Sequence, residues 1–430
     1  MALLWSETSS AVIFASIHID NSLFSLVQYK MSAYYENQSA LKTARRIDLS
    51  DLPSEIIKHI ASQLEHVDIF SLRLVCRTIN EKSFYYFSHE CFATISTVLS
   101  LSSLQMVKRI SEDDRLSFNV KKLLIKGRPS DIGQGLQWNR HLDGYFVAPL
   151  PCIDILRTIL IENLVNCRSF HICRQHQEDM FYTTDKITPG DVSAVLLTMV
   201  AETGLTIKSF ILDFKRHGTG RIDWKRLQTV QYQVPTFRAG WDHLEELDLS
   251  FTLTSELCDL AMGLITQASN LRNLTLSIDN YESESFLDHL SRAEKLPELQ
   301  KLHLSSMWVM SDSVSRLLQL IGGLRVLSFQ YVMLADGSWK SAFQEIRKNL
   351  PLLEDISVKR ISDSNSDATS MDFGGIAEDP IVPETNGRRF ELVRKKVRRV
   401  EKTIGVSYEG PRMDQALQIL GNSLDSSGQN

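Results

Sequence analysis

The chain has 430 residues, 43% of them hydrophobic, which excludes a disordered protein and provides enough apolar surface for two or three domains. Its 47 basic and 52 acidic residues leave a formal net charge of -5, which gives no global attraction to nucleic acid or to an anionic membrane. The six cysteines are widely spaced and show no disulfide framework, so we expect a reducing compartment, cytoplasmic and/or nuclear.

Residues 1–46 are an N-terminal extension to which the sequence assigns no function. Polar residues interrupt its apolar stretches before they reach the roughly 20 residues that a membrane-spanning helix needs. Glu7 stands where a signal peptide would carry basic residues, and no convincing cleavage site follows, so we expect no secretion. Met31 leaves open a later start of translation.

Residues 47–90 predict three short helices. We expect Ser50 or Asp51 to cap the first helix, with Pro53 in its first turn, and Asp68 to cap the second. One apolar face of the first helix comprises Ile56, Ile57, Ile60 and Leu64, and that of the second comprises Ile69, Leu72, Val75, Cys76 and Ile79. An aromatic third helix contains Phe84, Tyr85 and Phe87. So short a unit is close to the lower limit of independent stability, which indicates a permanent partner.

This segment resembles an F-box, the module that binds the Skp-family adaptor of SCF ubiquitin ligases. The resemblance rests on Leu52-Pro53, Glu55-Ile56, Ile60, Leu64, Asp68, Leu72-Arg73 and Val75-Cys76-Arg77. It implies adaptor-binding roles for Leu52, Pro53, Ile56, Ile57, Ile60, Leu64, Leu72, Val75 and Cys76. Phe84 and Tyr85 stand where many members have tryptophan, a departure that could weaken docking but would not abolish it. The alternative is an amphipathic helical hairpin that packs on the rest of the chain.

A Leu-x-x-Leu-x-Leu pattern recurs within residues 91–360. Its clearest copies begin at Leu244, Leu271, Leu299, Leu324 and Leu353, spaced by 27, 28, 25 and 29 residues. These steps match leucine-rich repeats, which measure about 20 to 29 residues and combine a strand with a helix. Weaker copies begin at Val120, Cys167 and Ile207, and their longer steps imply insertions, one of them the stretch Gly127 to Gly144.

The chain is therefore predicted to be α/β, with a short three-helix F-box followed by a degenerate leucine-rich-repeat solenoid that has a curved parallel sheet. Strand residues between the buried leucines should face the concave side and contact a target. Our candidates for target binding are Asp248, Thr275, Lys301, His303 and Ser328. They mix signs and polarities and do not form the arginine cluster of a dedicated phosphate reader.

Residues 361–387 predict a disordered acidic loop, and residues 388–430 a C-terminal capping element and tail. The basic run from Arg388 to Arg399 could be a nuclear-import signal, but interleaved apolar residues favour a structural element with a charged solvent face. A final helix that caps the repeats is predicted by the spacing of Met413, Leu417, Leu420 and Leu424.

No catalytic motif, cofactor site or metal site is predicted. Cys167, His171, Cys173 and His176 crowd together, but their spacing fits a repeat strand better than a zinc site. The leading hypothesis is a non-enzymatic adaptor that binds a Skp-family protein, and through it a cullin, and that presents an unknown protein target for ubiquitination. The alternative is a ligase-independent leucine-rich interaction scaffold.

Overall fold

The computed structural model describes residues 48–127, 131–136, 138–141, 151–174, 187–214, 227, 232–278, 282–363, 371, 373, 376, 390–397 and 400–424. The chain divides into two compact units, Met1–Tyr85 and Tyr86–Asn430, and we describe each by itself. Among the helices described, none has both the length and the apolar character needed to cross a membrane.

The first unit is helical. It contains η2 (Leu49–Asp51), α3 (Ser54–Ser62), α4 (His66–Leu74) and the beginning of α5 (Arg77–Phe92), which continues into the second unit. The fully buried side chains are few, namely Ile57, Ala61, Ile69, Ile79 and Ser83. Each of the three α-helices contributes to this small core, so the helices depend on one another for their burial.

Two predicted helix caps were wrong by two or three residues. Pro53, which we placed in the first turn, is the N-cap of α3, while Ser50 and Asp51 belong to η2. Glu65 rather than Asp68 is the N-cap of α4, because the Glu65 carbonyl already accepts hydrogen bonds from the amides of Asp68 and Ile69. Asp68 instead lies in the first turn, where a carboxylate is favourable to the helix dipole.

In the second unit, the described strands form one twelve-stranded sheet. Nine of them are parallel and adjacent in chain order, namely β1 (Thr94–Thr97), β2 (Lys122–Gly127), β3 (Ser169–Arg174), β4 (Ser209–Asp213), β5 (Glu246–Phe251), β6 (Asn273–Ile278), β7 (Lys301–Val309), β8 (Val326–Leu334) and β9 (Asp355–Lys359). The short β10 (Ser362–Asp363) pairs with the end of β8.

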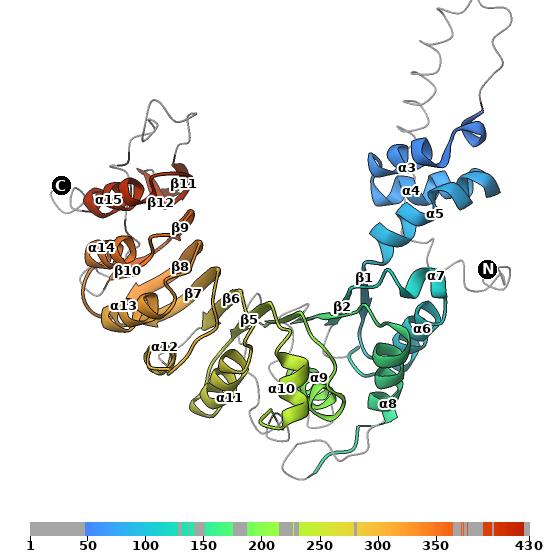
Figure 1. The fold of residues 1–430 in the computed structure, drawn as a ribbon, viewed down its shortest axis with the longest axis horizontal. Helices are drawn as coiled ribbons and strands as arrows, with labels where there is room; N and C mark the ends of the chain where they lie inside the picture. The colour runs from blue at the N-terminus through green and yellow to red at the C-terminus, as the bar shows by residue number, and fades with distance from the viewer. Residues whose placement is uncertain are drawn as a thin grey trace, which may run out of the picture. The chain divides into compact units, whose positions relative to one another are not determined.

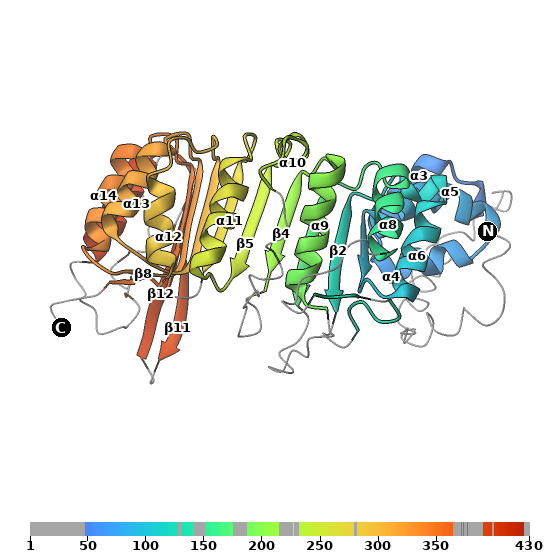
Figure 2. The same cartoon turned by 90° about the horizontal axis from the view of Figure 1, so that it is seen from below.

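Helices cover one face of this sheet and leave the other open, as Figures 1 and 2 show. They are α6 (Leu101–Ser111), α7 (Asp114–Ser117), α8 (Pro151–Arg157), η3 (Thr158–Asn163), α9 (Pro189–Thr203), α10 (Pro235–Trp241), α11 (Ser255–Thr266), α12 (Glu282–Ser291), α13 (Ser311–Leu320) and α14 (Trp339–Asn349). The sheet is curved, with the helices on its outer side (Figure 1).

The strand register explains the leucine pattern. Leu247 pairs with Leu274, and Leu274 pairs with Leu302, so equivalent leucines stack on the helix-covered face and are buried. The intervening residues fall on the opposite face because side chains alternate along a strand. One continuous core results, which runs from Ile95 to Leu420.

A second repeated feature fixes this register at the entry of the strands. The backbone carbonyl just before each of the strands β1 to β8 accepts hydrogen bonds from two successive amides at the start of the next strand. The accepting residues are Ala93, Lys121, Arg168, Lys208, Glu245, Arg272, Gln300 and Arg325. Because a one-residue slip would break both bonds at every step, the ladder holds the leucines in line.

Antiparallel pairing ends the parallel array. β12 (Val400–Glu409) pairs antiparallel with β9, and β11 (Glu391–Val397) pairs antiparallel with β12. The helix α15 (Met413–Ser423) packs on α14 and buries Met413, Leu417 and Leu420, as predicted for a final helix. Of the basic run, Arg394, Lys395 and Lys396 lie in a structural element, β11, as predicted, whereas the arginines at 388, 389, 398 and 399 lie outside the described residues.

The two regions predicted as loops are described only in part. Most of residues 361–387 lie outside the described residues, but Phe373 and Ile376 are buried in the core. In the stretch from Gly127 to Gly144, Arg140 forms a buried ion pair with Asp191 of α9, at 2.8 Å between Nη2 and Oδ2. Asp191 also accepts hydrogen bonds from the amide and hydroxyl of Thr188, the N-cap of α9.

Candidate interaction surfaces

The first candidate surface is apolar and lies on the helical unit. Val75 and Leu74 are 63% and 61% exposed, and Ile56, Val67 and Phe70 are also exposed. These are large aliphatic and aromatic side chains, which a folded monomer normally buries. So much exposed apolar surface on a module with so small a core indicates an interaction site.

The structure distributes the nine predicted adaptor-binding residues unevenly. Pro53, Ile56, Val75 and Cys76 are exposed, while Leu52, Ile60, Leu64 and Leu72 are half-buried. Ile57 is fully buried, so its side chain supports the module from within and presents no surface to a partner. Adjacent isoleucines thus have opposite roles, with Ile56 outside and Ile57 inside.

Sequence reasoning missed three exposed residues of α4. Val67, Phe70 and Leu74 recur with a spacing of three and four, which places them on one helix face. The predicted stripe contained Ile69 and Leu72 on another face of the same helix. A helix with apolar residues on two faces was the available sign that one face serves the module and the other a partner.

The turn that holds Leu52 and Pro53 is fixed by Lys82 of α5. The Lys82 ammonium donates hydrogen bonds to the Ser50 carbonyl at 2.8 Å and to the Leu52 carbonyl at 2.7 Å. A cation is well suited to this place because the carbonyls have no helical partner. Lys58 of α3 also lies over the ring of Tyr85, with 4.6 Å between Nζ and the ring centroid, and joins α3 to α5.

The second candidate surface is the open face of the sheet in the other unit. Its middle row runs across neighbouring strands through Asp248, Thr275, His303, Ser328 and Ser357, which pair directly in the register. All five are half-buried. Four of our target-binding candidates therefore lie side by side in one row, whereas Lys301 lies in the adjacent row.

That adjacent row carries more charged residues than the middle row. It contains Glu246, Asn273, Lys301, Val326, Asp355 and Glu409 in successive strands. Partial burial raises the pKa of Asp355, and the nearby carboxylate of Glu409 raises it further, while Lys301 lowers it. Burial alone lowers the pKa of His303, which favours the neutral form of this imidazole. The open face is polar and mixed in charge.

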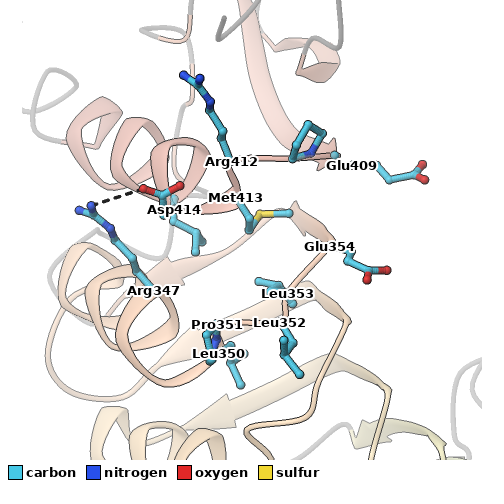
Figure 3. Close-up of a pocket in the computed structure, with 13 residues that line it drawn as sticks. Arg347, Leu350, Pro351, Leu352, Leu353, Glu354, Glu409, Arg412, Met413 and Asp414 are labelled. Carbon is cyan, nitrogen blue, oxygen red and sulfur yellow. Dashed lines mark ion pairs between the residues drawn. The ribbon is translucent and has the colours of Figure 1, made fainter. Parts of the chain in front are cut away.

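A groove of about 880 Å³ lies at the end of the array, between the loop after α14 and the turn before α15. Figure 3 shows an apolar floor that includes Leu353 and Met413, with charged residues around it. Arg347 and Asp414 face each other at 3.8 Å across its side. The Tyr408 hydroxyl donates to the Pro411 carbonyl at 2.5 Å and fixes the turn. Because its charges are opposite in sign and partly paired, we assign this groove to the packing of the last two helices.

The thiols of the second unit provide no activated nucleophile at the positions where a shift is resolved. Burial raises the pKa of Cys167 to about 12. Burial also raises the pKa of Cys258 to about 11, with a further increase from Glu282. In the part of the chain that the structure describes, no three His, Cys, Asp or Glu side chains gather as metal ligands, and His176 lies outside that part.

Comparison with known proteins identifies the helical module. The family model of the F-box domain matches residues 49–83, which span η2, α3, α4 and the first part of α5. No curated protein matches the chain. The chain therefore contains an F-box domain, a class of module that in general binds Skp-type adaptors and belongs to adaptors rather than enzymes.

Proposed function

We propose that this chain is a substrate-recognition subunit of an SCF-type ubiquitin ligase. The observation that carries the proposal is the F-box match at residues 49–83, on a module that exposes Ile56, Val67, Phe70, Leu74 and Val75. A Skp-family adaptor would cover this apolar face and connect the chain to a cullin. The surface is of the kind that lasting complexes bury, since their interfaces resemble a divided core.

In this proposal the second unit is a leucine-rich-repeat solenoid that binds the target. Its strand-by-strand parallel pairing, its stacked leucines and its open polar face support that interpretation. The target-binding candidates Asp248, Thr275, Lys301, His303 and Ser328 remain proposals. The mechanism is proximity, because a target held close to a charged conjugating enzyme reacts at a raised effective concentration while this chain makes and breaks no bond.

We also propose that the chain acts in the cytoplasm and/or the nucleus. The free cysteine Cys76, which follows the exposed Val75, is itself exposed, and a reducing environment would keep its thiol intact. The alternative function is a scaffold that uses the same surfaces without a ligase.

The test is whether the purified chain forms a stoichiometric complex with a Skp-family adaptor. Val75→Asp places a charge on an exposed position and should abolish the complex, since burying an unpaired charge costs several kcal/mol. Met106→Asp is the matched control, because Met106 is a similarly exposed apolar residue of α6 in the other unit. A folded wild-type chain that binds no adaptor would refute the ligase proposal.

Binding of the cullin separates the two functions. A complex of chain, adaptor and cullin is expected for the ligase subunit. A chain that binds the adaptor but excludes the cullin would support the scaffold.

A further inference from the structure

Two neighbouring strands, β7 and β8, each contain one non-glycine residue with a left-handed backbone, and a third such residue follows directly after β9. These are Ser306, Tyr331 and Arg360, with φ angles of 51°, 56° and 52°. Ser305 pairs with Gln330 and Met307 with Val332, so Ser306 lies opposite Tyr331. Arg360 follows Lys359, which pairs with Gln330, and so extends the same row. A left-handed backbone has a high conformational energy for residues with a Cβ, so its repetition along one row indicates a functional constraint.

The structural consequence is a change in which residues face the core. In β7, Leu302 and Leu304 are buried before Ser306, and Met307 and Val309 are buried after it. In β8 the same shift occurs at Tyr331, between Phe329 and Val332. The left-handed residue thus lets each strand continue with apolar residues under the helices, while the side chain at the shift stays outside the core.

This row displays an ordered pair of side chains next to a tryptophan. Arg360 Nη1 donates to the Tyr331 hydroxyl at 2.5 Å, and the guanidinium carbon lies 4.9 Å from the centroid of the Tyr331 ring. Tyr331 is 43% exposed, and Trp308, 38% exposed, pairs with Met333 two residues further along β8. Tryptophan, tyrosine and arginine are the residues most enriched at energetic centres of interfaces, and a pair already held in place loses little entropy on binding.

Charge is segregated along the strands at this end of the sheet. At the entry of the strands lie Asp355 and Glu409, which pair directly. At the other end lie Lys359, the last residue of β9, and Arg360, which follows it. Arg394, Lys395 and Lys402 lie on the adjoining hairpin of β11 and β12. Lys395 and Lys402 are directly opposite in the register, an arrangement that is unfavourable unless an anion relieves it.

We propose that this surface, comprising Trp308, Tyr331, Lys359, Arg360, Lys395 and Lys402, binds an acidic segment of a partner protein. Aspartate and glutamate side chains of the segment pair with the basic residues, and an apolar side chain packs against Trp308 and Tyr331. The proposal rests on the proposed function and deepens it, because it names the chemical class of the target.

The test is selection of a random peptide library on the immobilised full chain, followed by binding measurements with the most enriched peptide. We expect an excess of Asp and Glu over the unselected library and weaker binding in high salt. Arg360→Glu and Lys395→Glu should each weaken binding by at least about tenfold, since they place like charges together. Arg109→Glu is the matched control, because it makes the same charge change at an exposed site on α6.

Tyr331→Ala should weaken binding as well, whereas Phe118→Ala, at an exposed aromatic residue elsewhere in the unit, should not. Thermal melting shows which variants are folded. If Arg360→Glu unfolds, the test of the basic surface rests on Lys395→Glu, because Lys395 is exposed on β11. Enrichment without an acidic excess, no enrichment, or full binding by folded Lys395→Glu would overturn the proposal. So would binding that appears only when a serine of the peptide is phosphorylated.

Adaptor binding by the same preparations keeps the two proposals apart. A chain that binds the Skp-family adaptor but selects no acidic peptide refutes this inference alone. A chain that selects acidic peptides through Arg360 and Lys395 but binds no adaptor upholds the inference and refutes the ligase.

Discussion

The helical module and the second unit, called the repeat unit from here on, use their apolar residues in opposite ways. In the module, Val67, Phe70, Leu74 and Val75 are exposed around a core of only a few side chains. In the repeat unit, stacked leucines form one continuous core, and the free face of the sheet carries polar and charged residues. The first surface is suited to a lasting partner and the second to a partner that binds and leaves.

The same contrast predicts how each region depends on its surroundings. The repeat unit should be stable without a partner, because each of its strands and helices is covered by its neighbours. The module leaves part of its apolar surface to a partner, so its folding and its binding should be coupled.

The largest effect is expected inside the repeat unit, for Trp241→Ala. Trp241 is fully buried, its indole Nε1 donates to the Leu264 carbonyl at 2.8 Å, and its ring packs against Phe210 and Phe237. Its loss should reduce the free energy of unfolding by about 3–5 kcal/mol, measured by denaturant titration, and an adaptor should restore none of it. Phe118→Ala, at an exposed ring, should change it by less than about 0.5 kcal/mol.

In the module, Ile57→Ala and Ile56→Ala should act differently although the residues are adjacent. Truncating the buried Ile57 should destabilise the module by about 2–4 kcal/mol, and a saturating adaptor should restore part of this loss by mass action. Truncating the exposed Ile56 should leave the melting temperature unchanged and weaken adaptor binding. Hydrogen exchange and calorimetry measure the two quantities. Equal effects of the two changes on stability would contradict the division between inside and outside.

A smaller effect is expected for Lys82→Met, which keeps the length of the side chain and removes its charge. The carbonyls of Ser50 and Leu52 would lose a charged donor, at a cost of about 1.5–3 kcal/mol before water replaces it. Adaptor binding should weaken because the turn that holds Leu52 and Pro53 loosens. Lys82→Arg should recover part of the affinity, whereas wild-type affinity in Lys82→Met would show that the turn needs no such support.

The smallest effect, and a stabilising one, is expected for Asp355→Asn. Burial and Glu409 raise the pKa of Asp355, so the folded state disfavours its charged form. Above this pKa the wild type is therefore less stable than a neutral variant, by less than about 1 kcal/mol for a half-exposed group. As the pH falls through the raised pKa towards the ordinary value of 3.8, the advantage of asparagine should disappear. Melting temperatures at neutral and acidic pH measure this, with exposed Asp259→Asn as the control.

The parallel strands could be predicted from the sequence because burial has a simple period. Leu247, Leu274 and Leu302 recur wherever a strand must face the helices, and even the weaker copies at Phe170 and Phe210 became paired strands. The F-box could be predicted because its residues combine two helices at a fixed separation, and the family model matches residues 49–83.

Features that depend on backbone geometry could not be predicted in the same way. Ser306, Tyr331 and Arg360 are not residues that indicate a left-handed conformation, so the shift in strand alternation has no mark in the sequence. The antiparallel direction of β12 could not be predicted either, because the alternation of buried and exposed residues is the same for both strand directions. In the module, the exposed face of α4 was missed because the stripe through Ile69 already accounted for a buried helix.

The direction of β12 also sets the length of the array. Each parallel strand presents the same kind of edge to the strand that follows, so nothing in β1 to β8 determines how many strand-helix repeats follow. β12 occupies the edge of β9 from the opposite direction and leaves no place for another strand and helix of the repeating kind. We therefore expect that strand-helix repeats can be added or removed by duplication or deletion before β9, whereas the hairpin of β11 and β12, together with α15, ends the array.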